Sequence, residues 1–352
     1  MEFRKHISQR TNVQQIFQQI VETGPVSRRE LQAATGFSWG LISQVTNHLI
    51  AEGYLVTEDD LSSAGVGRRA EKLDVVSNNH FFIGVDIDSD GMYAVVTDMK
   101  GRVVESRRYS WPEKTYDKVI HTLYQILDVL MDRYADKNIN SIGVSVQGIT
   151  DMENGVSVYI RKIENWVDVP LRELLSQRYD VDVVVAHDPD CMMESERAIG
   201  MLRNTCAQNV LLMHYNYHSR SLGMSAMVGG QIYCGHSGRA AEIGYIIVGE
   251  KPDGSPKLLE DDLLDPNATK ERIFAGIGKA VAMANTMYNP EIIVLHVSEG
   301  REEAQMLDTV DYWLRTASYD TSVKLLRSCL KSDAKAMGAA LIMINRAIDE
   351  LL

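Results

Sequence analysis

The first 53 residues carry a hydrophobic pattern that predicts short helices with defined ends. Apolar residues recur at helical spacing over 12–21, and Gly24-Pro25 ends that segment. Ser27 begins a second helix as its N-cap, because Glu30 stands at the third helical position and completes a capping box. Gly36 ends this second helix. The pattern therefore predicts two helices separated by a short break.

A third helix is predicted from Ser38 to about Glu52, and Gly53 closes it. Its inward-facing apolar residues are Leu41, Ile42, Val45, Leu49 and Ile50. Two helices joined by a short turn, the second one amphipathic, are typical of a helix-turn-helix. Segments 54–57 and 71–76 are predicted strands, and the Gly/Ser/Arg-rich loop between them is the expected wing. Residues 1–78 are thus expected to form a winged helix-turn-helix DNA-binding domain.

The polar side of the third predicted helix is the expected DNA-reading surface. Gly40 and Ser43 are small enough to let the helix approach base edges, whereas Gln44 and Asn47 offer the paired amide contacts that suit adenine. The arginines of the wing can enter a narrow A·T-rich minor groove. The residues expected at the DNA are Arg28, Ser38, Trp39, Gly40, Ser43, Gln44, Asn47, Arg68 and Arg69. Two alternatives remain open: Trp39 stacks on the DNA backbone or only packs, and the unit reads DNA or is a plain three-helix module.

The pattern changes after residue 78 to buried strands that alternate with helices. Strands are predicted over 81–86, 93–98, 102–107, 142–147, 181–186 and 291–296 and near Val210, Leu222 and Ile243, with helices over 114–135, 190–200, 268–288 and 333–348. Two successive halves of this kind indicate an α/β duplication with a cleft between the halves. Residues 79–352 are therefore expected to form a second, two-lobed domain.

Composition and charge limit where DNA can bind. The chain has 352 residues, 45% of them hydrophobic, and a formal net charge of −12. Residues 1–57 hold five basic and four acidic residues, a balance of +1, so the acidic excess lies beyond them. Phosphate repels that acidic part, which confines DNA contact to the N-terminal module. Because one weakly basic module binds poorly, a homodimer or tetramer is expected.

The remaining composition favours a cytoplasmic protein. No apolar run reaches the roughly 18 residues that a spanning helix needs, and the N-terminus lacks the apolar region of a signal peptide. The four cysteines, Cys191, Cys206, Cys234 and Cys329, are scattered without Cys-x-x-Cys spacing. This distribution argues against disulfides and indicates a reducing compartment.

Several segments, in this order and spacing, resemble the ROK family (repressors, open reading frames and kinases). They are 142–148 (Ile-Gly-Val-Ser-Val-Gln-Gly), 165–171 (Asn-Trp-Val-Asp-Val-Pro-Leu), His187-Asp188, 235–244 (Gly-His-Ser-Gly-Arg-Ala-Ala-Glu-Ile-Gly) and 288–294 (Tyr-Asn-Pro-Glu-Ile-Ile-Val). The N-terminal module resembles that of the family's xylose-repressor and N-acetylglucosamine-repressor branch. The resemblance implies an actin/hexokinase-like (ribonuclease H-like) fold for the two-lobed part.

The departures from the family pattern fall at the nucleotide contacts. Family kinases carry an Asp-x-Gly-Gly-Thr turn, and 86–90 here is Asp-Ile-Asp-Ser-Asp, whose added carboxylates repel a triphosphate. The second phosphate loop matches 219–225, where only Gly223 remains, and His296-Val297 replaces paired glycines. The resemblance therefore implies a chain without ATP-dependent phosphorylation, without catalytic residues and without a cofactor.

The family zinc site is also lost. Tyr245 stands where the family has a histidine ligand, and 249–257 lacks the cysteines that would complete a tetrahedral site. The spacing of acidic residues in 86–91 resembles the start of a calcium loop, but Thr97 stands where such a loop needs a bidentate glutamate. A strand-to-strand turn is favoured there, and no bound metal is expected.

The sugar side of the family pattern is better preserved. The resemblance implies that Asp188 matches the catalytic base of the kinases, and that Glu242 and Glu260 match sugar-binding glutamates. His187 replaces the family's asparagine and Tyr245 its histidine, so the ligand is expected to differ from plain glucose. The alternative for each carboxylate is a solvated or ion-paired surface group.

The favoured hypothesis is a repressor of sugar-utilisation genes that binds A·T-rich palindromic DNA. A sugar or sugar derivative closes the cleft, changes the dimer geometry and releases the DNA. The first alternative is a regulator controlled by a protein partner, such as a component of a sugar phosphotransferase system. The second is a residual sugar kinase.

Overall fold

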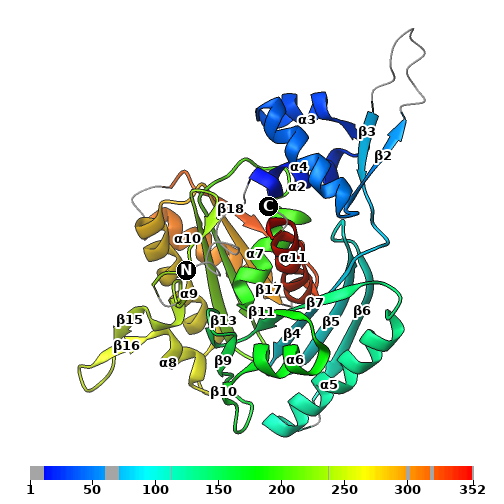
Figure 1. The fold of residues 1–352 in the computed structure, drawn as a ribbon. Helices are drawn as coiled ribbons and strands as arrows, with labels where there is room; N and C mark the ends of the chain where they lie inside the picture. The colour runs from blue at the N-terminus through cyan, green and yellow to red at the C-terminus, as the bar shows by residue number, and fades with distance from the viewer. Residues whose placement is uncertain are drawn as a thin grey trace.

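The computed structural model describes residues 12–59, 71–111, 113–236, 238–298, 302–317 and 321–350, and a small winged module stands at one end of a larger α/β frame (Figure 1). The module contains α2 Asn12–Thr23, β1 Val26–Ser27, α3 Arg28–Thr35, α4 Trp39–Ala51, β2 Leu55–Asp59 and β3 Glu71–Val75. Its sheet has the order β1-β3-β2, with antiparallel pairs. The three predicted helices and the two wing strands are therefore confirmed.

Local capping explains why the helices of the module begin and end where they do. The Ser27 hydroxyl accepts a hydrogen bond from the Glu30 N–H, and the Glu30 carboxylate accepts one from the Ser27 N–H, at 3.3 and 2.7 Å. Gly36 ends α3 with φ 72°, a left-handed conformation that glycine adopts without strain. Ser38 caps α4 by accepting the Leu41 N–H at 3.3 Å. The predicted capping residues thus set both helices.

The first lobe is built on a five-stranded sheet of order β11-β7-β4-β5-β6. Its strands are β4 Phe81–Asp88, β5 Gly91–Asp98, β6 Val103–Ser110, β7 Ile139–Val146 and β11 Asp182–His187. Helices α5 Tyr116–Arg133 and α6 Leu171–Tyr179 cover it, beside a small sheet of β8 Ile149–Asp151, β9 Val156–Tyr159 and β10 Val167–Val169. The order places the carboxyl ends of β4, β7 and β11 together, which is where the site forms.

The second lobe has a sheet of order β14-β13-β12-β17-β18. Its strands are β12 Val210–Asn216, β13 Ser221–Val228, β14 Gln231–Ile232, β17 Ile292–Ser298 and β18 Lys324–Arg327. Around it are α8 Leu259–Leu264, α9 Lys270–Tyr288, α10 Glu303–Ala317 and the hairpin β15 Ile247–Glu250 with β16 Pro256–Leu258. No described helix, α9 with its 19 residues included, is long and apolar enough to cross a membrane.

The strand expected near Ile243 is wrong. Residues Ile243–Tyr245 form a short 3₁₀ helix, η1, because their hydrogen bonds are local: Tyr245 N–H bonds to the Glu242 carbonyl at 3.1 Å and Ile246 N–H to that of Ile243 at 3.2 Å. This turn brings Glu242 toward the cleft instead of extending a sheet. Helices α6 and α10 had no counterpart among the predicted elements.

Helix α11 Ala334–Asp349 lies against the first sheet with its backbone in direct contact. A Cβ atom at Gly84 on β4 would lie 1.9 Å from the Ala336 carbonyl oxygen, and one at Gly143 on β7 would lie 2.1 Å from that of Ala339. Only glycine fits at both positions. On its other side α11 packs along α7 Asp188–Ala198, and both helices lie between the two sheets (Figure 1). Because of these contacts, α11 cannot shift without moving its neighbours.

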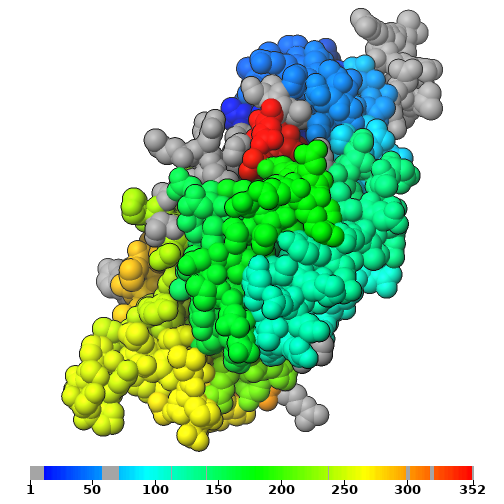
Figure 2. All heavy atoms as spheres, turned by 60° about the horizontal axis from the view of Figure 1, so that its bottom comes forward, coloured from blue at the N-terminus to red at the C-terminus, as the bar shows by residue number. Residues whose placement is uncertain are grey.

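The far end of α11 holds the winged module. Gln14 on α2 donates hydrogen bonds to the Asn345 carbonyl at 3.3 Å and to Asp349 Oδ2 at 2.7 Å. One buried apolar cluster runs from α2, α3 and α4 into α11 and the adjoining strands. Figure 2 shows the last described residues of the chain directly beside this module. The module therefore shares a continuous core with the frame across residues 78 and 79.

Candidate functional site

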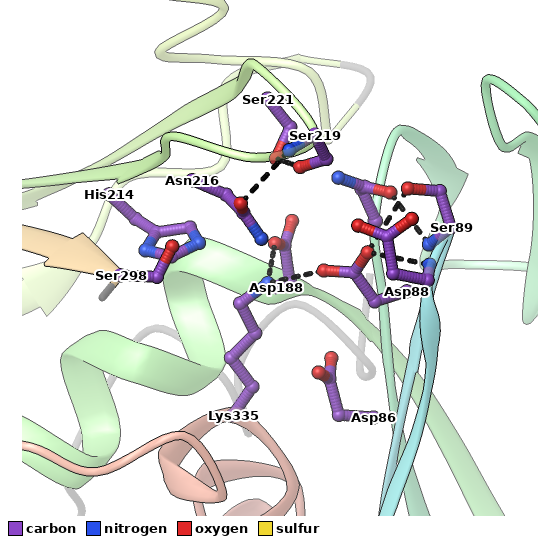
Figure 3. A network of polar contacts seen from close by, with 12 residues as sticks. Asp86, Asp88, Ser89, Asp188, His214, Asn216, Ser219, Ser221, Ser298 and Lys335 are labelled. Carbon is purple, nitrogen blue, oxygen red and sulfur yellow. Dashed lines mark hydrogen bonds and ion pairs between the residues drawn. The ribbon is translucent and has the colours of Figure 1, made fainter. Parts of the chain in front are cut away.

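A buried lysine stands at the centre of the cleft (Figure 3). Lys335, in the first turn of α11, is 6% exposed, and its Nζ lies 2.8 Å from Asp188 Oδ2 and 3.5 Å from Asp88 Oδ2. Asp86 lies close by at the end of β4, where it accepts a hydrogen bond from the Ser145 hydroxyl at 2.7 Å. We call Lys335, Asp86, Asp88 and Asp188 the lysine–aspartate cluster. Lys335 was not among the predicted site residues, although it is the one cationic residue in the first turns of a predicted apolar helix.

The charges of the lysine–aspartate cluster are strongly interdependent. Burial alone lowers the pKa of Lys335, but the carboxylates of Asp188, Asp86 and Asp88 outweigh it and raise this pKa above its usual range. Burial raises the pKa of Asp86 to about 7, although the ammonium of Lys335 partly opposes that shift. The lysine is therefore charged at neutral pH, and Asp86 is partly protonated.

We expect Asp86→Asn to remove part of the pH dependence of stability. The pKa of Asp86 is about 7 in the folded chain and near 3.8 when unperturbed, so the stability it supplies is complete below pH 4 and is lost as the pH rises through 7. Between pH 5 and pH 8 the wild type should therefore lose about 2 kcal/mol more free energy of unfolding than the variant. Urea unfolding at both pH values measures this difference. Asp308→Asn, on the exposed face of α10, is the matched control, and equal slopes for all three proteins would contradict the assignment.

In the turn after β4, side chains of the turn and of neighbouring segments already bind the backbone N–H groups. Gln147 Oε1 accepts the Ser89 N–H at 3.0 Å, and Asp88 Oδ1 accepts the Asp90 N–H at 3.2 Å. Lys114 pairs with Asp90 at 2.6 Å. The backbone N–H groups that a phosphate would need are thus already bound. The turn joins paired strands, with Asp88 opposite Gly91, which agrees with the predicted strand-to-strand turn.

In the segment that matches the second phosphate loop, 219–225, and just before it, backbone N–H groups are also bound by a side chain. Asn216 Oδ1, at the end of β12, accepts the His218 N–H at 3.0 Å and the Ser219 N–H at 3.1 Å (Figure 3). From the first lobe, Lys162 donates to the Ser219 carbonyl at 2.9 Å. The side chain of Asn216 therefore takes up backbone donors here, and the loop is tied to the opposite lobe.

The structure brings four of the five predicted sugar-binding residues together. His187 ends β11, Asp188 begins α7, and the distance from His187 Nε2 to Asp188 Oδ1 is 3.8 Å. Burial raises the pKa of Glu242, with His187 opposing the shift and Asp188 and Glu260 adding to it, so their charges act on one another. We call His187, Asp188, Glu242 and Glu260 the sugar-side group. Tyr245, at the end of η1, is instead 57% exposed, and its role stays a prediction.

An arginine from the first lobe reaches the sugar-side group. The Arg161 guanidinium lies 2.5 Å from Glu260 Oε1 and donates to the Arg220 carbonyl at 3.2 Å. The partners are 99 residues apart in sequence, so no local signal could identify this contact. Arg161 therefore joins the two lobes across the cleft. A ligand that binds Glu260 has to share this carboxylate with Arg161 or displace the guanidinium.

The described ranges, 12–59, 71–111, 113–236, 238–298, 302–317 and 321–350, offer no metal site. Their histidine, cysteine, aspartate and glutamate side chains form no group of three or more that could hold a metal ion. In the segment where the family carries its zinc cysteines, the β15–β16 hairpin is joined to α8 by an ion pair of Lys251 with Asp261 at 3.0 Å. Packing and ion pairs hold this loop.

The predicted DNA-reading residues of α4 form one solvent-facing surface. Trp39 is 49% exposed, and Gly40, Gln44 and Asn47 are also exposed, whereas Ser43 is half-buried. The hairpin of β2 and β3 extends beside this surface, away from the frame (Figure 1). Arg68 and Arg69 lie outside the described residues. The helix thus offers the polar surface that reading a major groove requires.

Arg28 has a different position from the one its predicted role implies. Its guanidinium donates to Thr46 Oγ1 and Asn47 Oδ1, both at 2.9 Å, and pairs with Glu71 Oε2 at 2.5 Å. It therefore joins α3 to α4 and β3. This contact also holds the amide oxygen of the exposed Asn47 side chain. A direct DNA contact by Arg28 stays a prediction.

These features define the class of protein. A winged helix-turn-helix is combined with two lobes, each built on a mixed five-stranded sheet, and with acidic side chains in the cleft between them. The model of the ROK family matches residues 82–257, half of the chain. The chain belongs to the ROK family, and the resemblance noted in the sequence is confirmed.

Relatives along nearly the whole length carry regulator names. The DNA-binding transcriptional dual regulator NagC of Escherichia coli is 24% identical, over 95% of this chain and 92% of its own. The xylose repressor of Bacillus spizizenii is 22% identical, over 97% of this chain and 96% of its own. The match covers the winged module as well as the frame, which the family model alone does not.

Solved structures confirm the fold. A ROK family transcriptional regulator described as a homologue of the E. coli MLC protein superimposes with a TM-score of 0.77, at 19% identity, over 99% of this chain and 98% of its own. A ROK glucokinase from Streptomyces griseus, solved with glucose and AMPPNP, gives a TM-score of 0.57 at 19% identity over 74% of this chain and 98% of its own. The predicted actin/hexokinase-like frame with an N-terminal winged helix is therefore confirmed.

Proposed function

We propose that this chain is a transcriptional regulator, acting as a repressor of sugar-utilisation genes, whose cleft binds a sugar and no longer phosphorylates it. One observation carries the proposal: the sugar-side group is assembled, whereas the phosphate loops are closed and a lysine occupies the cleft beside Asp188. The repressor names of the full-length relatives support the same function. Residues 1–78 are the proposed DNA-binding domain, and 79–352 the sensor.

The charges in the cleft argue against phosphoryl transfer. A general base must be free to accept a proton from the attacking hydroxyl, but Asp188 is paired with Lys335 at 2.8 Å. Phosphate binding also needs free backbone donors or added cations, and the turn at Asp88 offers carboxylates. The residues that remain suit recognition of hydroxyl groups, because an ionised carboxylate accepts directed hydrogen bonds from them.

The route from the cleft to the DNA-binding domain runs along α11. Lys335 in its first turn contacts Asp188, while its last turns contact Gln14 of α2. A sugar that binds Asp188 changes the partners of Lys335, and the glycine contacts of α11 make the helix and its sheet respond as one unit. Lys335 has different partners with and without bound sugar. This difference gives the sugar unequal affinity for the two conformations, which a switch requires.

The DNA partner follows from the charge and size of the module. A single weakly basic winged helix offers few phosphate contacts, so two copies are needed for useful affinity. A homodimer, or a tetramer built from it, then reads two half-sites of an A·T-rich palindrome. Gln44 and Asn47 are the residues for adenine contacts.

A ligand-binding experiment tests the sensor. We expect xylose or N-acetylglucosamine to raise the melting temperature and bind in calorimetry, more tightly than glucose, and Mg·ATP to do neither. Glu242→Gln should weaken sugar binding at least tenfold, about 1.4 kcal/mol, because the amide accepts fewer hydroxyl hydrogen bonds than the carboxylate. Glu250→Gln, on the exposed strand β15, is the matched control.

Three results would count against the proposal. Tight Mg·ATP binding with sugar turnover would restore the kinase alternative. Failure of every sugar, with DNA binding intact, would favour control by a protein partner. Equal loss of affinity in Glu242→Gln and Glu250→Gln would place the sugar elsewhere.

A further inference from the structure

A cavity adjoins the lysine–aspartate cluster, and Asp86, Asp88 and Lys335 lie in its wall. It measures about 290 Å³ and opens between the β4–β5 turn, the ends of β12 and β17, and the first turn of α11. We call it the histidine cavity. Its walls include Asp86, Asp88, Tyr93, Met192, His214, His296 and Lys335.

Two histidines form the inner wall of the histidine cavity. His214 on β12 and His296 on β17 are register partners in parallel strands, and their Nδ1 atoms lie 3.0 Å apart. Burial, with the charge of Lys335, lowers the pKa of His214 well below its usual value and that of His296 to about 4. Both rings are therefore neutral at physiological pH.

The two histidines hydrogen-bond to each other through their Nδ1 atoms. A neutral imidazole has one N–H, so one Nδ1 donates and the other accepts. Nε2 of His214 is buried and has no hydrogen-bond partner in the described part of the chain. A buried polar atom of this kind calls for a hydrogen-bond partner from a ligand, and a hydroxyl group can act as donor or as acceptor.

The electrostatics of the histidine cavity favour a neutral ligand. Lys335 already supplies the cation that the carboxylates require, so a second cation has no place. An anion would meet Asp86 and Asp88 at the floor. The exposed Arg108, whose guanidinium lies 5.7 Å from the Tyr93 ring centre, stands at the mouth, where water screens its charge.

Hydroxyl groups match what the walls offer. The unpartnered Nε2 of His214 can form a hydrogen bond with a hydroxyl group, the carboxylate oxygens of Asp88 accept hydrogen bonds, and the hydroxyl of Ser298 can do so as well (Figure 3). Tyr93 and Met192 supply apolar surface of the kind that packs against the C–H face of a sugar ring. The volume is close to the lower end, about 300 Å³, of ordinary small-molecule sites. One neutral polyhydroxylated ring fits these conditions.

We propose that the effector is a saccharide of two rings, with one ring at the sugar-side group and the second in the histidine cavity. The inference rests on the proposed sugar-sensing function and specifies its ligand. The two sites share the Lys335–Asp188 ion pair, because Lys335 lines the histidine cavity and its Nζ lies 2.8 Å from Asp188. A ligand that spans the pair also contacts the ends of β12 and β17, which a single ring at the sugar-side group does not.

Calorimetry and thermal shift on the full chain test this inference with matched ligands. The monosaccharides are xylose, glucose and N-acetylglucosamine, and the two-ring ligands are their β-1,4-linked dimers xylobiose, cellobiose and chitobiose. At least one dimer should bind tenfold or more tightly than its monosaccharide. His214→Asn keeps a polar atom near Nδ1 and removes Nε2, so it should abolish the gain, whereas His214→Gln places an amide near Nε2 and should retain most of it. Ser298→Leu, which narrows the cavity from β17, should also abolish the gain.

The outcomes separate this inference from the proposed function. A dimer preference that disappears in His214→Asn and Ser298→Leu, with monosaccharide affinity within twofold of wild type, supports the two-ring ligand. Equal affinity for monosaccharide and dimer, or a dimer preference that both variants retain, overturns the two-ring ligand and leaves sugar sensing intact. If no saccharide of either size binds the wild type, both proposals fail.

Discussion

Replacing Lys335 with methionine is expected to lower the free energy of unfolding by about 3–5 kcal/mol at pH 8, the usual cost of leaving a buried charge without its partner. Asp188 and Asp88 would lose an ammonium at 2.8 and 3.5 Å, and Asp188 is buried whereas Asp88 is partly buried. Methionine has a similar length, so the loss reports charge more than volume. Urea unfolding followed by circular dichroism measures the change.

The pH dependence of this loss has a definite sign. The pKa of Lys335 is raised, so the stability it gives is complete below its ordinary value of 10.5 and does not vary between pH 5 and pH 8. The change in that interval comes from Asp86, whose carboxyl group protonates more readily without the lysine. The difference between Lys335→Met and wild type should therefore shrink as the pH falls from 8 to 5.

Two further variants isolate the charge effect. Lys331→Met, in the exposed segment just before α11, should change stability by less than about 0.5 kcal/mol. Asp188→Asn in the Lys335→Met background should recover part of the loss, because it removes the carboxylate left unpaired. Equal losses in Lys331→Met and Lys335→Met, or strictly additive effects of the double variant, would show that the ion pair has no special role.

Local signals in the sequence were sufficient to predict the helices and strands of the winged module. Ser27, Glu30, Gly36 and Ser38 each act on backbone groups within four residues of themselves, so their spacing alone defines where α3 and α4 begin and end. The strands of the wing follow from their composition and the turn-rich loop between them. This is why the predicted and observed boundaries differ there by only a few residues.

Contacts between distant segments were not accessible from the sequence. The His214–His296 pair joins residues 82 positions apart, and it exists because β12 and β17 happen to be neighbours in the sheet. Lys335 meets Asp188 only after α11 packs against α7. The family resemblance supplied Asp188, Glu242 and Glu260, but it did not supply Lys335, because this residue lies outside the segments that carry the resemblance.

In short segments, hydrophobic periodicity also did not distinguish a strand from a turn or a helix. The apolar residues around Ile243 suit a strand as well as a turn, and only the local hydrogen bonds of η1 decide between them. Helix α10 has just three buried residues, Met306, Val310 and Leu314, at a spacing of four. Its mostly polar surface explains why it was not predicted.

Gln44→Glu is expected to weaken DNA binding at least tenfold while leaving the fold unchanged. Gln44 is exposed on α4, beside Gly40 and Asn47, on the surface proposed to enter the major groove. A carboxylate there cannot donate to adenine N7, and it repels the phosphates on both sides of the groove. Glutamate and glutamine have similar helix propensities, so the melting temperature should change little. Fluorescence anisotropy measures the affinity on a duplex that the wild-type chain has selected from a random-sequence pool.

The control makes the same charge change far from α4. Gln125→Glu lies on the exposed face of α5, in the first lobe, and should alter DNA affinity by less than twofold. Salt titration adds a second criterion, because phosphate contacts give a logarithmic affinity that falls linearly with the logarithm of salt concentration. If Gln44→Glu and Gln125→Glu weaken binding equally, net charge and not the surface of α4 governs the interaction. A wild-type affinity that does not change between 50 and 200 mM salt, roughly the range over which phosphate contacts cost several orders of magnitude, would remove DNA reading by this module altogether.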